Sequence, residues 1–331
     1  MNKNEIPPIQ NIEMTKEQIK RKRELLSNEV KQIKIEEHTD FSSLIDAFSD
    51  SSFEARNLGR AAKLYHKQIK AKTAIIWSLS GSLFSAGLRQ ITIDAIRSNL
   101  VDALVCTGAL FEQDMLEAIE PTIKQIESYD TTTVRASVPM YLLSKYIKEK
   151  TDIKVILSGE GSDELSGSYL YFHNAPTPHQ FQIECERLIN DVQHFDVLRC
   201  DKTTAGNSLE VRVPFFDKVF AVDYMNIEPS LKVVRDGYEK YLLRKSFEND
   251  LPNDIVWRRK DGFSDGVSLV NKPWYQIIQD YTQKNFQCSE KEYYQKIFSK
   301  YYKNYEYICP YEWLPKWSKE SNPSGRLLLN E

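Results

Sequence analysis

The sequence lacks the cysteine patterns of disulfide-rich and zinc-binding proteins. Its five cysteines are scattered, odd in number and never arranged as Cys-x-x-Cys; they stand at positions 106, 185, 200, 288 and 309. This spacing indicates neither a disulfide framework nor a zinc site, and it fits a reducing environment. We therefore expect a cytoplasmic protein.

Long apolar runs and a strong excess of charge are also missing. No apolar segment reaches the roughly 20 residues that a membrane-spanning helix needs. Residues 1–14 are polar, include Pro7 and Pro8, lack the apolar core of a signal peptide, and are expected to be a disordered tail. A net charge of −3 argues against general binding to nucleic acid or to a membrane surface.

What is present is the composition of a globular chain. Its 331 residues, 41% hydrophobic and 27% charged, suffice for one large or two ordinary domains. Apolar runs at 74–79 and 102–106 are typical of buried strands, and the stretches at 86–98 and 111–119 are typical of helices. This alternation predicts an α/β fold with one open, mainly parallel sheet of about five strands and helices on both faces.

The most informative stretch is Val155-Ile-Leu-Ser158-Gly-Glu-Gly-Ser-Asp163-Glu164. A short apolar run, which predicts a buried parallel strand, leads into a loop of serines, glycines and acids. Open α/β sheets bind ligands at such strand ends, and glycines let the backbone approach phosphate oxygens. Acids beside phosphate can share a Mg²⁺ ion with it. On the pattern alone, a polar glycine turn without any ligand is an alternative of about equal weight.

The same loop and the following Tyr169-Leu-Tyr-Phe-His-Asn-Ala-Pro176 resemble the synthetase domain of glutamine-dependent asparagine synthetase, and the resemblance extends to the C-terminus. That family activates the side-chain carboxylate of aspartate with ATP and transfers ammonia to the acyl-adenylate. The resemblance implies the small-molecule substrates aspartate, ATP and ammonia, with Mg²⁺. It also implies residue roles: general base for Glu160, the metal for Asp163, and nucleotide or pyrophosphate binding for Ser158, Gly159, Gly161 and Ser162.

Two later motifs extend this resemblance. The segment Trp257-Arg-Arg-Lys260-Asp-Gly-Phe-Ser-Asp265-Gly266 matches one whose lysine lies over the acyl-adenylate, which implies a catalytic role for Lys260. Residues 196–217 match the family's signature around its active-site cleft, and we interpret most of their charged side chains as a structural ion-pair network. Residues 284–317, rich in Tyr and Lys, are expected to form a packed C-terminal helical layer.

The first part of the chain carries a different resemblance. Segments 52–65, 80–89 and 106–114 resemble the N-terminal part of deoxyhypusine synthase, whose corresponding loops contact NAD. The remnants of an NAD site would be Ser82, Ser85, Thr107, Gly108, Ala109 and Glu112. We favour the alternative that these are ordinary loop residues, because that family's catalytic half has no counterpart in the chain.

The synthetase resemblance is also incomplete. The family's ATP loop and glutaminase domain have no counterpart, and the loop 80–85 has Ser82 and Phe84 where an ATP loop has glycine and aspartate. The sequence therefore predicts a fusion of a tail (1–14), a deoxyhypusine-synthase-like fragment (15–119) and an asparagine-synthetase-like region (120–331). No Gly/Ser/Pro-rich linker marks the junction.

Three functions are compatible with such a fusion. The first is an asparagine synthetase-like ligase that uses free ammonia, with loop 80–85 in place of the ATP loop. The second is a catalytically inactive chain that binds a nucleotide or pairs with a related intact subunit in a homo- or hetero-oligomer. The third, ranked last, is NAD binding or aminobutyl transfer inherited from the first segment. The synthetase assignment covers the larger part of the chain.

Overall fold

A computed structural model describes residues 14–25, 30–38, 40–80, 83–268, 272–319 and 322–324. Contacts divide the chain into two compact units, Met1–Thr107 and Gly108–Glu331. The predicted tail lies outside the described residues except for Met14. The division at 107/108 precedes the junction near 119 that the sequence suggests, and the 15–119 and 120–331 boundaries stay a prediction.

The first unit contains several helices and one pair of parallel strands. Its elements are α1 (Lys16–Leu25), η1 (Ile35–Glu37), α2 (Phe41–Phe48), α3 (Phe53–Lys70), β1 (Ile76–Leu79), η3 (Phe84–Leu88), α4 (Arg89–Arg97) and β2 (Ala103–Cys106). The helices α2 and α3 approach closely because Gly59 has no side chain; a Cβ there would lie 2.4 Å from the backbone nitrogen of Ser49. Strand β1 pairs with β2 from Ile76↔Ala103 to Leu79↔Cys106.

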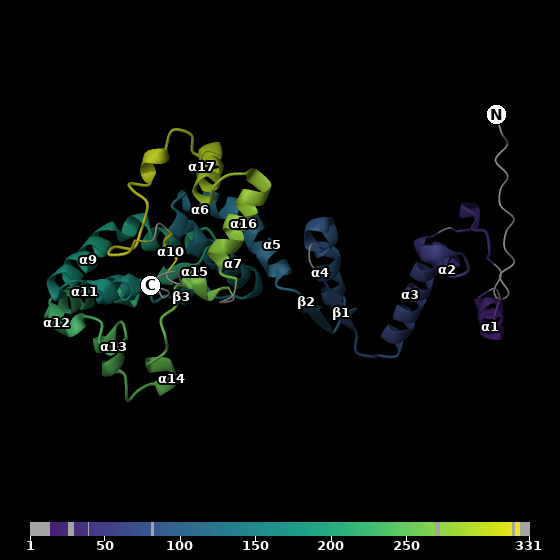
Figure 1. The fold of residues 1–331 in the computed structure, drawn as a ribbon, viewed down its shortest axis with the longest axis horizontal. Helices are drawn as coiled ribbons and strands as arrows, with labels where there is room; N and C mark the ends of the chain where they lie inside the picture. The colour runs from purple at the N-terminus through teal and green to yellow at the C-terminus, as the bar shows by residue number, and fades with distance from the viewer. Residues whose placement is uncertain are drawn as a thin grey trace. The chain divides into compact units, whose positions relative to one another are not determined.

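The second unit is mainly helical and contains the other strand pair (Figure 1). Its first elements are α5 (Ala109–Glu117), α6 (Ile119–Ile126), α7 (Thr131–Lys150), β3 (Val155–Leu157), α8 (Ser162–Ser166), η4 (Leu170–Asn174), α9 (Pro178–Asp191), η5 (Val192–His194), α10 (Asp196–Ala205) and β4 (Glu210–Arg212). There follow η6 (Pro214–Phe216), α11 (Lys218–Met225), α12 (Pro229–Lys232), α13 (Tyr241–Ser246), α14 (Asn253–Val256), α15 (Phe263–Gly266), α16 (Trp274–Phe286), α17 (Glu290–Tyr301) and η7 (Glu306–Ile308).

The α/β class with parallel strands is confirmed, but the single five-stranded sheet is not. The described strands form two separate two-stranded parallel sheets, β1–β2 and β3–β4. The strands are also less buried than predicted, since Leu157 is 76% exposed and Ile76 is 64% exposed. The physical reason is that a strand is covered on both faces only inside a larger layered sheet, and neither pair has further strands within the described residues.

The main hydrophobic core of the second unit lies among α6, α7, α16 and α17 (Figure 1). These helices contribute fully buried apolar side chains at helical spacing, among them Ile119, Ile123, Ile126, Val134, Val138, Trp274, Ile278, Tyr294 and Phe298. A second cluster joins η4 and α9 through Tyr171, Phe172, Phe181 and Cys185, and Trp313 covers it. Residues 302–317 contain one short η7 turn rather than the helix that the predicted helical layer implied.

Helix α7 begins at residue 131 because Asp130 caps it. One Asp130 oxygen accepts hydrogen bonds from the backbone nitrogen and the hydroxyl of Thr133, both at 2.8 Å. The other accepts one from the backbone nitrogen of Trp313 at 2.9 Å. Asp130 is buried, and burial raises its pKa despite these bonds. The cap therefore also fixes the C-terminal segment.

A buried ion pair ties α7 to α17. The Arg135 guanidinium donates to both carboxylate oxygens of Glu290, including an Nε–Oε1 bond of 2.7 Å, and both side chains are 4% exposed. Glu290 also accepts from the Tyr294 hydroxyl at 2.8 Å. Arg135 further donates to the side-chain oxygen of Asn322 at 2.7 Å. One arginine thus joins two core helices and the segment 322–324.

We predict that Arg135→Met destabilises the protein by about 3–5 kcal/mol, because it leaves Glu290 buried without its cation. Urea unfolding followed by circular dichroism measures the loss. The matched control is Lys300→Met, which breaks the exposed Lys300–Glu120 pair and should change stability far less. Equal effects of the two substitutions would show that the buried pair is no more important than a surface one.

Candidate functional site

The loop after β3 is shaped by two glycines with different roles. The backbone nitrogen of Ser158 donates to the carbonyl of Arg212 at 2.9 Å, which extends the β3–β4 pairing by one residue. Gly161 has a φ of +91°, and a Cβ there would lie 2.8 Å from the Phe216 ring, so no larger residue fits. A Cβ on Gly159, by contrast, would meet no atom within 4 Å. The loop is therefore open to a ligand at Gly159.

The same loop has backbone donors without internal partners. Within the described part of the chain, the N–H groups of Gly159, Glu160 and Gly161 donate no hydrogen bond, whereas Ser162 donates to the Gly159 carbonyl at 3.3 Å. Consecutive unpaired N–H groups in a turn attract anions. This geometry is consistent with the phosphate contacts expected of Ser158, Gly159, Gly161 and Ser162.

Asp163, at the start of α8, binds two lysines from distant parts of the chain. Its Oδ2 accepts from Lys260 Nζ at 2.6 Å, and its Oδ1 contacts Lys240 Nζ and the Ser168 hydroxyl. Lys240 also donates to the Ser162 hydroxyl at 2.8 Å. Burial alone would raise the pKa of Asp163, but the charges of Lys260 and Lys240 outweigh it and lower the pKa below its ordinary value. The carboxylate is therefore ionised.

The metal role of Asp163 stays a prediction. Mg²⁺ commonly takes one or two carboxylates together with phosphate oxygens. In this structure both Asp163 oxygens are bound by lysine ammonium groups. No group of three or more His, Cys, Asp or Glu side chains within the described residues could hold a metal by itself.

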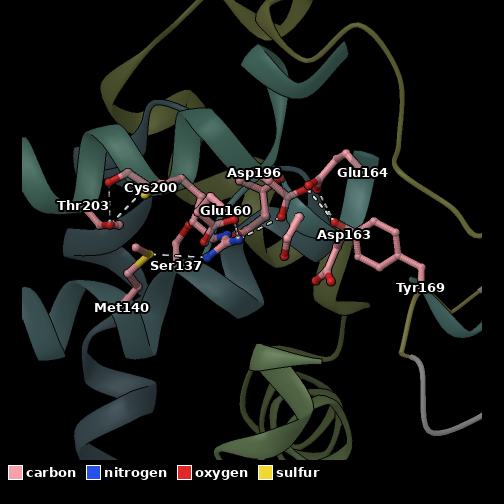
Figure 2. A network of polar contacts seen from close by, with 12 residues as sticks. Ser137, Met140, Glu160, Asp163, Glu164, Tyr169, Asp196, Cys200 and Thr203 are labelled. Carbon is pink, nitrogen blue, oxygen red and sulfur yellow. Dashed lines mark hydrogen bonds and ion pairs between the residues drawn. The ribbon is translucent and has the colours of Figure 1, made fainter. Parts of the chain in front are cut away.

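Glu160 lies on the other side of the loop and pairs with Arg199 of α10. Figure 2 shows Glu160 near Asp196, with Asp163, Glu164 and Tyr169 grouped to one side. Arg199 donates to Glu160 at 2.9 Å and to Asp196 at 2.8 Å. Burial raises the pKa of Glu160, and although Arg199 opposes this effect, the charges of Asp196 and Asp163 add to it. Glu160 therefore holds a proton more readily than an exposed glutamate.

Glu164 is the most deeply buried acid of the loop. Its Oε1 accepts from the Tyr169 hydroxyl at 2.5 Å, while its Oε2 is buried without a hydrogen-bond partner. Burial, Asp196 and Asp163 together raise the pKa of Glu164 well above its ordinary value. Burial likewise raises the pKa of Tyr169, which keeps the hydroxyl protonated as a donor. The protonated form of Glu164 is therefore favoured relative to an exposed glutamate.

The segment that carries Lys260 is fixed at its far end. Asp265 in α15 is buried and accepts from the Ser324 hydroxyl at 2.8 Å. Ser324 donates its backbone N–H to Asn322 at 3.1 Å, and Asn322 accepts from Arg135. Lys260 is therefore connected to the helical core through the C-terminal segment.

Sequence reasoning did not identify two charged residues of this site. No sequence motif points to Lys240, and the 196–217 segment indicates Arg199 only as part of an ion-pair network. Lys240 has a φ of +54°, in the left-handed region, and stands immediately before α13. No spacing in the sequence shows that either side chain reaches the 158–164 loop. Elsewhere in 196–217, Arg212 pairs with the neighbouring Glu210 at 2.8 Å on an exposed surface.

The residues predicted as NAD-site remnants are divided between the two units. Ser82 lies outside the described residues, and Ser85 lies in η3. Thr107 ends the first unit, and Gly108 and Ala109 begin the second unit at the start of α5. Glu112 forms an ion pair with Lys272 at 2.9 Å. Their NAD contacts stay a prediction.

Comparison with known families agrees with both resemblances. The asparagine synthase family model matches residues 109–183 and 175–319, and the deoxyhypusine synthase model matches residues 43–138. The two matches overlap over 109–138, which includes α5, α6 and the start of α7. The first match covers more than half of the sequence, so the chain belongs to the asparagine synthase family.

Curated relatives point to the same family. The glutamine-hydrolysing asparagine synthetases of Gallus gallus, Cricetulus griseus and Homo sapiens are 45%, 43% and 41% identical over 235, 237 and 237 residues. These alignments cover 65–66% of this chain. The chain spans about 42% of the length of these relatives. Among the described residues, no helix is both long and apolar enough to cross a membrane.

We predict that the free energy of unfolding of the Glu164→Gln variant increases relative to that of the unmodified protein as pH rises. Between the ordinary glutamate pKa of about 4.3 and the raised folded pKa, the folded state holds a proton that the unfolded state has released, so stability falls with rising pH. Glutamine removes this linkage. Denaturant unfolding at about pH 5 and about pH 8 measures the difference. The control is Glu149→Gln, at the exposed end of α7. A gain that did not grow with pH would contradict a neutral Glu164.

Proposed function

We propose that this chain binds the pyrophosphate portion of MgATP at the 158–164 loop and activates the side-chain carboxylate of aspartate for amidation by ammonia. The observation that carries the proposal is the cluster of Asp163 with Lys240 and Lys260. Two ammonium groups held at one carboxylate provide the positive charge that a polyphosphate requires. The membership of the chain in the asparagine synthase family supports the same substrates.

The proposal assigns roles to the loop residues and to Lys260. Ser158, Gly159, Gly161 and Ser162 contact phosphate, through unpaired backbone donors and hydroxyls. Lys260 neutralises charge that develops on the phosphoryl oxygens, and its ammonium lies 5.8 Å from the centre of the Tyr169 ring, which limits its freedom. Mg²⁺, when bound at Asp163, would supply further charge neutralisation.

Glu160 is the proposed general base for the attack of ammonia. Its raised pKa makes it a better proton acceptor than an exposed glutamate. Arg199 holds one carboxylate oxygen at 2.9 Å, which orients the side chain. Asp196 shares the same guanidinium, so the positive charge of Arg199 is divided between two acids.

A second candidate function is binding of the nucleotide or of a partner subunit without turnover. It is favoured by Ser82 and Phe84, which stand where an ATP loop has glycine and aspartate. The partner would be another copy of this chain or a related intact synthetase. In either case we propose a cytoplasmic location, on the basis of the scattered cysteines.

We predict that the protein binds inorganic pyrophosphate in a Mg²⁺-dependent manner and that Asp163→Ala abolishes the dependence, because it removes the proposed metal ligand. Calorimetric titration of pyrophosphate into the protein, once with Mg²⁺ present and once with a chelator, measures this dependence. Asp280→Ala, an exposed acid on α16, should leave binding unchanged. Equally tight binding to the unmodified protein in the presence of chelator would reject the metal role of Asp163.

A second prediction separates turnover from binding. With aspartate, ammonia and MgATP, we expect slow asparagine formation, because Ser82 and Phe84 stand where an ATP loop has glycine and aspartate. Misplacement of a reacting group by about 1 Å can cost on the order of a hundredfold. Any aspartate-dependent release of AMP and pyrophosphate should be lost in Lys260→Ala. Asparagine formation should be lost in Glu160→Ala. Robust synthesis that survived both substitutions would place the active site elsewhere.

A further inference from the structure

Helix α3 of the first unit carries a row of four cations on one face. Arg60, Lys63, Lys67 and Lys70 follow one another at intervals of three, four and three residues. At 3.6 residues per turn, this spacing places all four side chains within an arc of about 80° along about 15 Å of the helix. All four residues are exposed. We call this set the α3 cation row.

The α3 cation row has no acidic neighbours along the chain. Glu54, in the first turn, is the one acid of the helix, and no Asp or Glu occurs between Ala55 and Ile93. Within the part of the chain that the structure describes, none of the four cations forms an ion pair or a side-chain hydrogen bond. Like charges at this spacing repel one another and destabilise a helix. The net charge of −3 of the whole chain therefore does not describe this surface, which is positive.

Other faces of α3 are fixed by contacts within the first unit. The close approach of α2 is possible because Gly59 has no side chain. The Tyr65 hydroxyl donates to the carbonyl of Leu100, and the Tyr65 ring lies 6.3 Å from the Trp77 ring, measured between centroids. The helix is thus anchored beside the row, and the four cations are presented to solvent at a fixed spacing.

We propose that the α3 cation row binds the phosphodiester backbone of a nucleic acid. Such a backbone carries negative charge at regular intervals and no positive charge. This matches a row of cations without acids between them. Because the contacts are made to phosphates, binding does not depend on the base sequence. The site lies in the first unit and is independent of the proposed function.

Two other anionic partners fit the row less well. The surface of a folded protein normally carries charges of both signs, so part of it would repel an acid-free row of cations. A helix that binds a membrane surface buries its own apolar face in the lipid. In α3, however, Gly59 faces α2 and the Tyr65 ring faces Trp77. A nucleic acid is therefore the partner that this helix favours.

Phosphate binding by this row has a measurable salt dependence. Each cation that neutralises a phosphate releases condensed counterions, so the logarithm of the binding constant falls linearly with the logarithm of the salt concentration. The slope is about −0.7 per contact for single strands and about −0.9 for duplex DNA. Four contacts therefore predict slopes of about −3 and about −4.

The test is the fluorescence anisotropy of labelled oligonucleotides titrated with the full chain between about 50 and 200 mM salt. The probes are single-stranded RNA, single-stranded DNA of the same sequence, and duplex DNA. Lys63→Gln combined with Lys67→Gln should halve the slope and weaken binding roughly tenfold or more at the lower salt, because two of four contacts are lost. Replacing both lysines by arginine keeps the charges and should preserve binding.

The matched control is Lys145→Gln combined with Lys148→Gln, which removes two exposed lysines from α7 and should change neither value. Circular dichroism shows whether each variant is folded. If the double α3 variant does not fold, Arg60→Gln alone should reduce the magnitude of the slope by about 0.7–0.9. Binding of RNA or of DNA with the predicted slope supports the inference and shows which nucleic acid is preferred.

Several outcomes would overturn the inference. It is wrong if no probe binds, if the slope is near zero, or if the α3 and α7 variants have equal effects. Polyglutamate and vesicles of phosphatidylcholine with phosphatidylserine are titrated in parallel, and tighter binding to either would identify an acidic protein or a membrane as the partner. Pyrophosphate with Mg²⁺ at constant ionic strength should not displace the oligonucleotide. Displacement would place the binding at the 158–164 loop, whereas failure of the α3 row alone leaves the proposed function unaffected.

Discussion

The contact of Asp163 with Lys240 and Lys260 is the interaction on which the candidate site depends. It joins three segments that are far apart in the sequence, since Asp163 and Lys260 alone are separated by 97 positions. Two ammonium groups this close would repel one another without an anion between them. The Asp163 carboxylate therefore keeps the two ammonium groups together beside the 158–164 loop.

This arrangement needs a rigid support, which the second unit provides through buried polar groups. Arg135 bonds Glu290 and Asn322, and the Ser324 hydroxyl bonds Asp265 near the Lys260 segment. The buried charges of Arg135 and Glu290 compensate one another, so this contact fixes the geometry without leaving either ion unpaired. Within the described residues no cation pairs with Glu164, and burial raises its pKa, which favours the protonated form. The pKa of Asp163 is lowered and that of the adjacent Glu164 is raised.

Local sequence signals predicted much of the secondary structure and failed where long-range packing decides. Helix α2 forms at residues 41–48 because its apolar spacing and the Asp40 cap agree. The start of α7 depends on Asp130, which also accepts a hydrogen bond from the distant Trp313. The single sheet was wrong for a similar reason: apolar runs such as 155–157 identify strands, but not the number of strands that pair beside them.

The sequence by itself determined the family and the loop that carries the proposed chemistry, because glycines and acids at a strand end have a restricted set of uses. It also determined the roles expected of Glu160, Asp163 and Lys260 through the resemblance. Only the tertiary structure showed that Lys240 and Arg199 reach that loop. These contacts depend on how helices and turns pack across long sequence separations, which no local pattern encodes.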